Sequence, residues 1–169
     1  MASKTLFTLG FESLTVVDFI RLVKEQEVSR IVDIRGKGLI AVGRIPFSPK
    51  QLKSVLKNVN VDYIQMPEVE MPEKLENRAR GNGNRAEFIK EYVEIVSSDK
   101  SIVKKVKKYF SDDKVLILCF EKDSEACKRK LFANLVVTIL PDEIKIINLS
   151  IRDLKPLVIP PPEQPRYKL

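Results

Sequence analysis

Apolar residues recur along this chain with two spacings, one typical of strands and one typical of helices. Short aliphatic runs predict five strands, at residues 5–10, 30–35, 61–66, 115–119 and 144–149. Between them, apolar residues three or four positions apart predict helices that begin after Thr15, begin at Ser48 and Pro49, and cover 86–96, 101–110 and the start of 124–140. The end of the last segment, VVTIL, fits a helix or a strand. The polar stretch NRARGNGNR at 77–85 predicts a loop.

Strands that alternate with helical segments indicate parallel pairing through right-handed crossovers. We therefore predict an α/β fold, a mostly parallel central sheet flanked by helices in a three-layer sandwich. VLILC at 115–119 is the most hydrophobic strand, so we place it at the centre of the sheet. We expect a single domain over residues 1–155 and an extended tail over 156–169, where half of the ten prolines lie.

The composition describes a soluble globular protein, since 44% of the 169 residues are hydrophobic and 31% are charged. No apolar run approaches the about 20 residues that span a bilayer, and the N-terminus lacks the apolar core of a secretory signal. We therefore expect a cytoplasmic protein without a membrane partner. The net charge of +7 is compatible with a nucleic acid or a phosphorylated ligand. Its spread along the chain is equally typical of the Lys- and Glu-rich surfaces of thermophile proteins.

The chain contains no histidine and two cysteines. This composition excludes Ser-His-Asp and Cys-His catalysis and histidine-containing metal sites. It also argues against a structural zinc centre and a disulfide framework, so we expect neither a metal nor a cofactor. Any acid–base chemistry would fall to carboxylates, lysine, tyrosine or cysteine.

Charged residues follow four of the predicted strands. They are Glu12 after the first, Arg35 at the end of the second, Glu68 after the third and Glu121 after the fourth. Because parallel strands end at one edge, where α/β proteins collect ligands, we predict a charged pocket there. Glu12 and Glu121 are candidate catalytic carboxylates, and Arg35 and Glu68 are candidate ligand-binding residues. The same charges could instead form an ion-pair network, and Asp33, on the same strand face as Arg35, could simply pair with it.

Further candidates lie in the segment LCFEKDSEACKR, which follows the fourth strand. Asp123 or Ser124 is expected to cap the next helix, so that Cys127 lies in its first turn beside Lys128 and Arg129. A helix N-terminus and neighbouring cations stabilise a thiolate, which makes Cys127 a candidate catalytic thiol. Lys128 and Arg129 are candidate ligand-binding residues.

Both cysteines also have a structural interpretation. Cys127, Leu131 and Leu135 recur at four-residue spacing, as on a buried helix face, and we weigh this interpretation equally with a functional one. Cys119 ends an apolar strand and is expected to pack in the core. The lysines of 104–108 form either a solvated helix face or, as the less favoured alternative, a contact with nucleic acid.

Several of these segments carry a resemblance to a known family. They are TLGFE at 8–12, VDIR at 32–35, PFS at 46–48, YIQMPE at 63–68, Phe88 with Tyr92, and LCFEKDSEACKR at 118–129. On these motifs the chain, over roughly Thr5 to Leu149, resembles the domain of unknown function 488 family. The last motif is the most specific, since family members look like L-C-x-E, a short acidic turn, then Cys-His-Arg. The resemblance implies an α/β fold with these polar residues gathered at one end, and it implies no established reaction.

The chain departs from the family pattern within that motif. Lys128 stands where the family usually has histidine, and Asn148 takes the place of another histidine in the final strand. Lysine keeps a positive charge but shuttles protons poorly near neutral pH. If the family's chemistry depends on that histidine, this member would bind a ligand without turning it over.

Taken together, these residues predict a protein that binds a phosphorylated or nucleotide-like small molecule at the strand ends. Arg35 and Arg129, with the amides of the helix start, could hold its anionic group. Whether the protein is an enzyme stays open. The alternatives are a nucleic-acid-binding module that uses the basic surface and a non-catalytic scaffold that engages a protein partner through the proline-rich tail.

Overall fold

The computed structural model describes residues 4–36, 47–80, 85–124 and 127–156. Over these residues five strands form a single sheet in the order β3-β2-β4-β1-β5, and all neighbouring pairs run parallel. The strands are β1 (Lys4–Gly10), β2 (Arg30–Asp33), β3 (Asp62–Gln65), β4 (Lys114–Cys119) and β5 (Ile144–Leu149). The predicted α/β fold with a parallel central sheet is confirmed.

The central strand is β4, as its composition predicts. Every residue from Val115 to Cys119 is buried. A strand covered by helices on both faces places apolar side chains on both sides, so its sequence loses the alternation of polar and apolar positions.

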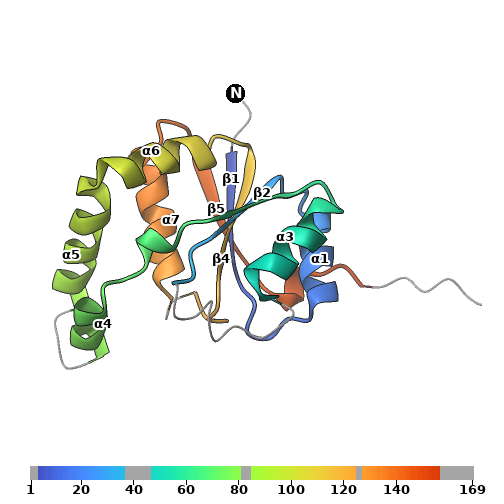
Figure 1. Cartoon of the computed structure of the whole chain (residues 1–169), viewed down its shortest axis with the longest axis horizontal. Coiled ribbons are helices and arrows are strands. Elements are labelled where there is room, and N and C mark those ends of the chain that lie inside the picture. Colours follow the sequence, from blue (N-terminus) through green and yellow to red (C-terminus); the bar gives the residue numbers. More distant parts are fainter. Residues whose placement is uncertain (1–3, 37–46, 81–84, 125–126, 157–169) are drawn as a thin grey trace, which may run out of the picture.

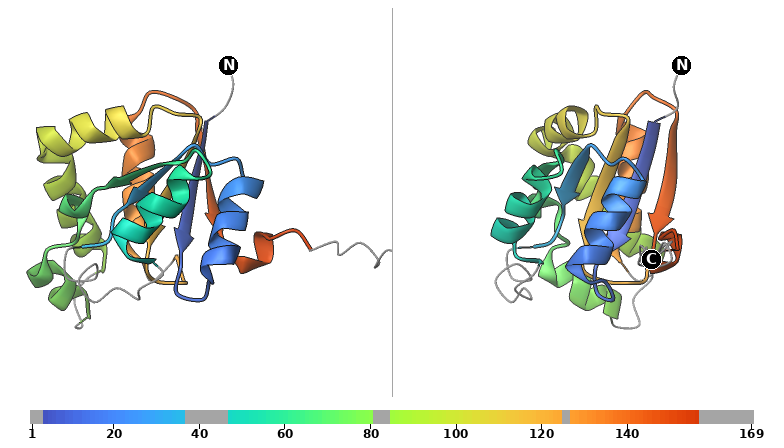
Figure 2. Two further views of the ribbon diagram at one scale, coloured as in Figure 1. Left: turned by 45° about the vertical axis from the view of Figure 1, so that its right-hand side comes forward. Right: turned by 90° about the vertical axis from the view of Figure 1, so that its right-hand side faces the viewer.

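Helices cover both faces of the sheet and complete the three layers (Figure 1). One layer consists of α1 (Val16–Glu25) and α3 (Pro49–Lys57), and the other contains α5 (Arg85–Ser98), α6 (Lys100–Tyr109) and α7 (Lys128–Ile139). Figure 2 shows these layers from two further sides. Phe19 and Leu52 belong to the core under α1 and α3, whereas Ile102 and Phe132 belong to the core under α6 and α7.

A side-chain N-cap marks the start of both α1 and α3. Thr15 accepts a hydrogen bond from the backbone N–H of Asp18 at 3.1 Å, and Ser48 accepts one from that of Gln51 at 3.4 Å. Pro49 occupies the first turn of α3, where its missing N–H costs no hydrogen bond. Both caps agree with the sequence, because capping depends on residues within one turn.

The structure corrects or decides three local predictions. The loop predicted over 77–85 is wrong at its start, since α4 (Glu73–Arg80) continues to Arg80. This segment is rich in Glu, Lys, Arg and Ala, which are strong helix formers despite their polarity. The ambiguous segment VVTIL belongs to α7 as far as Ile139. Residues 81–84 and most of the predicted tail, 157–169, lie outside the described residues.

Short 3₁₀ turns follow β3 at Pro67–Val69 and β5 at Ile151–Asp153. None of the helices in the described ranges has both the length and the apolar character needed to cross a bilayer.

Candidate functional site

The carboxyl ends of the parallel strands meet at one edge, at the bottom of Figures 1 and 2. Gly10 of β1 is paired in register with Cys119 of β4, and Asp33 of β2 with Leu118. Pairing continues past the strand ends, because the backbone N–H of Glu12 donates to the carbonyl of Phe120 at 3.1 Å. The loops after these three strands therefore leave the sheet side by side, as expected for a parallel sheet.

A thiol–carboxylate cluster lies where β4 ends and α7 begins. Glu121 Oε2 accepts a hydrogen bond from Cys119 Sγ and one from Cys127 Sγ, each at 3.0 Å. These three atoms lie within 4.8 Å of one another. Both cysteines are free and buried, whereas Glu121 is half-buried. We call these residues the Cys119–Glu121–Cys127 cluster.

Cys127 itself is the N-cap of α7. Its Sγ accepts a hydrogen bond from the backbone N–H of Arg129 at 3.4 Å, and its backbone is extended. The prediction that Asp123 or Ser124 caps the helix, with Cys127 inside the first turn, is therefore wrong. The reason is that Cys127 is itself buried in the core with Cys119 and directly precedes the first helical residue, Lys128. The helix N-terminus still acts on Cys127, now through the amide bonded to its sulfur.

The two thiols have opposite pKa shifts. The pKa of Cys127 lies below its ordinary value chiefly because of its interaction with the Cys119 thiol, to which the Arg129 amide adds, while burial and Glu121 oppose the shift. The pKa of Cys119 rises because of the same interaction between the two thiols, burial and the charge of Glu121. Burial opposes ionisation of Glu121, but the hydrogen bonds from Cys127 and Cys119 outweigh it and lower its pKa. Cys127 is therefore the more readily ionised of the two thiols, and the hydrogen bonds that the thiols donate favour the ionised form of Glu121.

Arg129 donates two hydrogen bonds to the loop that carries Glu121. Its Nη1 donates to the carbonyl of Glu121, and its Nη2 donates to the carbonyl of Lys122 at 2.9 Å. The Cα of Gly10 packs against the same Glu121 carbonyl, so any side chain at position 10 would overlap it. The buried guanidinium therefore fixes the loop after β4, and the missing side chain of Gly10 lets the end of β1 approach that loop closely.

Arg35 forms a buried ion pair with Asp33, as the alternative interpretation allowed. Its Nη2 lies 2.6 Å and its Nε 2.9 Å from the two carboxylate oxygens, and Tyr63 donates a further hydrogen bond to Asp33. The guanidinium also stacks over the ring of Phe11 at 4.9 Å. Burial opposes the charge, but Asp33 outweighs it and raises the pKa of Arg35. Burial raises the pKa of Tyr63, so its hydroxyl stays protonated and donates a hydrogen bond to the Asp33 carboxylate.

The remaining predicted site residues have these partners. Glu12 accepts a hydrogen bond from the backbone N–H of Lys122 at 3.0 Å. Glu68 forms an ion pair with Lys105 of α6, which balances its charge without a ligand. Lys128 lies 3.7 Å from Glu70, and its side chain is 11% exposed.

Sequence reasoning missed Cys119 and Glu70 as site residues. The sequence places Cys119 in the core, where it is fully buried, but its thiol also donates a hydrogen bond to Glu121. Glu70, two residues beyond Glu68, is the acid that approaches Lys128, and its carboxylate lies against the Cα of Gly36. No local signal distinguishes these two glutamates, because only the path of the loop after β3 decides which of them turns toward α7.

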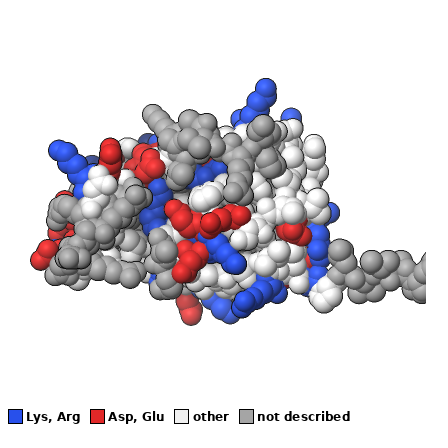
Figure 3. All heavy atoms as spheres, turned by 90° about the horizontal axis from the view of Figure 1, so that it is seen from below, with Lys and Arg blue, Asp and Glu red and all other residues white. Residues whose placement is uncertain are grey.

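The face that carries these strand ends has mixed charge. Seen from below, acidic side chains gather near its centre and lie directly beside basic ones (Figure 3). Such a surface can place acids and cations against one bound group, which is the electrostatic character of many functional sites.

Fold and cluster together define an α/β domain with a polar site at the carboxyl edge of a parallel sheet. Its sequence matches the family described as Domain of unknown function DUF488 over residues 15–136, and the chain belongs to this family. This confirms the resemblance carried by the motifs. No match to the chain was found among curated proteins or among solved structures.

Proposed function

We propose that this domain binds a small anionic molecule, phosphorylated or nucleotide-like, at the carboxyl edge of its sheet. The anionic group would lie over the loops after β1 and β4 and against the first turn of α7. We place the protein in the cytoplasm, where both thiols stay reduced.

Unused hydrogen-bonding capacity of two buried arginines carries this proposal. Arg35 and Arg129 are each 1% exposed, yet Arg35 Nη1 and Arg129 Nε have no hydrogen-bond partner within the described part of the chain. A buried donor without an acceptor costs about 1–3 kcal/mol, and more when it is charged, so such groups usually hold a water or an ion. The oxygens of a phosphate or carboxylate are the acceptors that guanidinium groups bind best.

The geometry refines the roles predicted for each residue. Arg35 would donate through Nη1 alone and Arg129 through Nε alone, because the other two nitrogens of each guanidinium already donate hydrogen bonds. Lys128 would supply the more accessible cation, since its contact with Glu70 is as long as 3.7 Å. Among the candidate catalytic groups, Cys127 has the lowered pKa that a thiol nucleophile requires.

Ligand-induced thermal stabilisation tests this proposal. Inorganic phosphate, AMP, ATP and ribose 5-phosphate are each added to the full chain, and the unfolding midpoint is measured. A ligand at 100 times its dissociation constant stabilises by about 2.7 kcal/mol, which raises the midpoint of a domain of this size by about 5–10 °C. We expect Lys128→Gln and Arg129→Lys to reduce or abolish this rise.

The matched control is Lys53→Gln, which removes one exposed lysine from α3 on the other face of the sheet. It is expected to keep the full ligand effect. Arg35→Ala is unsuitable as a test, because it would leave the charge of Asp33 buried without a partner. The proposal fails if no anion in the panel raises the midpoint, or if the rise is unchanged in both Lys128→Gln and Arg129→Lys.

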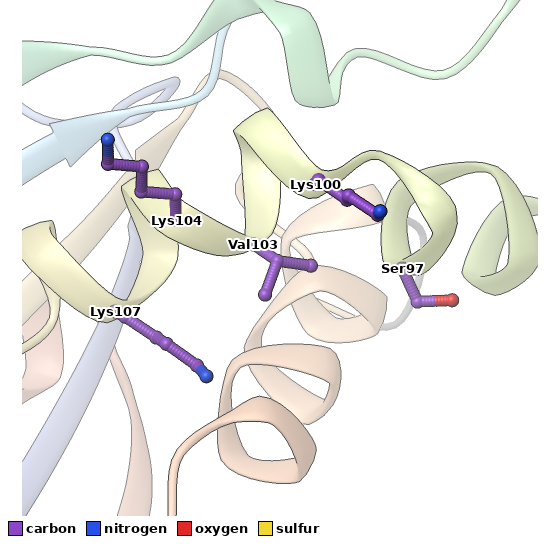
Figure 4. A pocket seen from close by; sticks show the side chains of 5 residues that line it. All are labelled: Ser97, Lys100, Val103, Lys104 and Lys107. Carbon is purple, nitrogen blue, oxygen red and sulfur yellow. The ribbon is translucent and has the colours of Figure 1, made fainter.

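A basic groove on α6 favours nucleic-acid binding as a second candidate function. Three exposed lysines, Lys100, Lys104 and Lys107, line an open groove of about 360 Å³ with Val103 and Ser97. Figure 4 shows the three lysines along α6, with Ser97 at the end of α5. Cations at this spacing on one helix face can follow the phosphates of a nucleic acid. In Figure 1, α6 lies at the top, away from the carboxyl edge, so this candidate needs no part of the cluster.

The salt dependence of binding separates this candidate from the first. If each of the three lysines neutralises one phosphate of duplex DNA, replacing all three by glutamine lowers the slope of log affinity against log salt by about 2.7. The matched control replaces three exposed lysines of α3, at positions 50, 53 and 57, which changes the net charge equally. Equal slopes for the two triple variants, or no binding to DNA and RNA oligonucleotides, would eliminate this function.

A further inference from the structure

We propose that Cys119, Glu121 and Cys127 form a binding site for a thiophilic divalent cation of the Zn²⁺ type. The site would lie at the carboxyl edge of the central strand β4, where the chain enters α7. This inference goes beyond the anionic ligand proposed above and does not depend on it, because the cation would be held by the side chains of the chain alone.

The positions of the three ligand atoms fit a tetrahedral ion. The sulfurs of Cys119 and Cys127 each lie 3.0 Å from the same Glu121 oxygen, and all three atoms lie within 4.8 Å of one another. Zinc bonds of about 2.3 Å to sulfur and about 2.0 Å to oxygen place tetrahedral ligand atoms about 3.5–3.8 Å apart. The ligand atoms therefore need to move by no more than about 1 Å to enclose the ion.

The chemistry of the donors indicates which ions would bind. Two thiolates select soft or borderline cations such as Zn²⁺ over Mg²⁺ and Ca²⁺, which prefer oxygen ligands only. Three protein ligands leave a fourth tetrahedral position open, the arrangement found in catalytic rather than structural zinc sites. Cys119 and Cys127 are 0% and 5% exposed, so the half-buried Glu121 marks the side from which the ion and its fourth ligand would enter.

Arg129 positions two of the three ligands. Its backbone N–H donates to Cys127 Sγ, and its guanidinium holds the carbonyl groups of Glu121 and Lys122. Contacts of this kind orient ligands before the metal binds and are a regular part of metal sites. Gly10 adds to this support, because only a residue without a side chain allows β1 to pack against the Glu121 carbonyl.

The charge around the cluster also suits a divalent cation. Two thiolates and one carboxylate sum to −3, and a divalent ion reduces this sum to −1. Arg129 and Lys128 lie beside the cluster, and the charge of Lys128 acts on Glu121 directly. The bound ion would therefore leave no large uncompensated charge in this partly buried place.

This site contradicts an expectation drawn from composition. Two cysteines and no histidine argue against a metal centre when only the usual ligands are counted. The third ligand is a glutamate two residues after Cys119, and Cys127 contacts it from the N-cap position of α7.

Cobalt binding provides a direct test. The full chain is reduced with a phosphine, stripped with a chelator and titrated with Co²⁺ without oxygen, followed by Zn²⁺. We expect one Co²⁺ per chain, with visible bands of tetrahedral cobalt and a thiolate-to-cobalt charge-transfer band, all removed by one equivalent of Zn²⁺. If the reduced protein shows no thiolate-to-cobalt band, the proposal is overturned.

Two variants test individual ligands, and a third serves as their control. Cys127→Ser removes a thiolate while keeping a good N-cap for α7, so the fold is preserved. We expect it to bind Co²⁺ more than tenfold more weakly and to lose much of the charge-transfer intensity. Glu121→Gln, which keeps the shape of the side chain, is also expected to weaken binding more than tenfold. Glu12→Gln is the matched control, because this neighbouring carboxylate bonds the Lys122 amide and lies outside the cluster.

Circular dichroism confirms that each variant is folded before its affinity is compared. Wild-type affinity in either Cys127→Ser or Glu121→Gln would overturn the three-ligand site. The anionic-ligand function would be untouched by that result, because this assay contains no phosphorylated compound.

Discussion

The buried ion pair between Asp33 and Arg35 supports a prediction whose magnitude can be worked out from the structure. Asp33 is 0% exposed and Arg35 is 1% exposed, and a hydrogen bond from Tyr63 adds to the hydrogen bonds between them. Arg35→Met keeps much of the apolar stem but leaves the Asp33 carboxylate buried without its counter-ion. Breaking a buried pair from one side costs about 3–5 kcal/mol.

That loss is large for a domain whose total stability is expected to be about 5–15 kcal/mol. For a chain of this size it lowers the unfolding midpoint by about 6–20 °C. The double variant Asp33→Asn with Arg35→Met removes both charges, and the asparagine amide can still bond Tyr63. It should therefore be more stable than the single Arg35→Met variant, since no charge remains buried alone.

Urea unfolding followed by far-ultraviolet circular dichroism measures these differences, which suits a chain that has no tryptophan to report by fluorescence. Arg21→Met is the matched control, because Arg21 is 24% exposed and pairs with Glu25 along α1, so its loss should cost clearly less than breaking the fully buried pair. The reasoning is refuted if Arg35→Met costs no more than Arg21→Met, or if the double variant is no more stable than the single one.

Three further predictions concern other elements. Gly10→Ala should destabilise by about 1–3 kcal/mol or more, because its Cβ would overlap the Glu121 carbonyl, and a wild-type urea midpoint would contradict this packing. Cys127→Ser should leave the stability of the metal-free protein within about 1 kcal/mol of wild type, whereas Cys127→Val should lose about 1 kcal/mol more by removing the cap of α7. Asp99 caps α6, and the Ile102 and Ser101 amides chiefly lower its pKa. The stabilisation by Asp99 is therefore complete above the ordinary carboxylate pKa and is lost as pH falls through the lowered value. Asp99→Ala should therefore be less stable than wild type at neutral pH, with a gap that narrows in acid, and a gap that stays constant with pH would argue against this cap.

Predictions that depended on nearby residues agree best with the structure. Thr15 and Ser48 cap helices as expected because a cap bonds an amide two or three residues away. The same local logic misplaced the cap of α7, where cysteine, an uncommon capping residue, takes the role that Asp123 or Ser124 was expected to fill. Residues 77–80 are helical because Arg and Ala favour a helix, although the polar, glycine-containing stretch 77–85 as a whole predicts a loop.

The partners of the charged residues could be narrowed but not chosen from the sequence. Asp33 and Arg35 are two residues apart in the sequence, which offers their pairing as one of two alternatives. Glu68 and Glu70 are equally good candidates by sequence, yet the first pairs with Lys105 and the second approaches Lys128. These choices depend on how loops from different strands pack, which no local pattern encodes.

The alternation of strands and helices determined a parallel sheet, and a parallel sheet requires its strand ends to share one edge. The sequence by itself therefore placed the loops after β1, β2 and β4 together. Only the tertiary structure decided which atoms meet there, as when Glu12 bonds the amide of Lys122, 110 residues away, or when Glu121 accepts both thiols. The physical reason is that strand direction follows from the order of elements, whereas a hydrogen bond requires positions accurate to a few tenths of an ångström. Such positions are reached only when the whole core is packed.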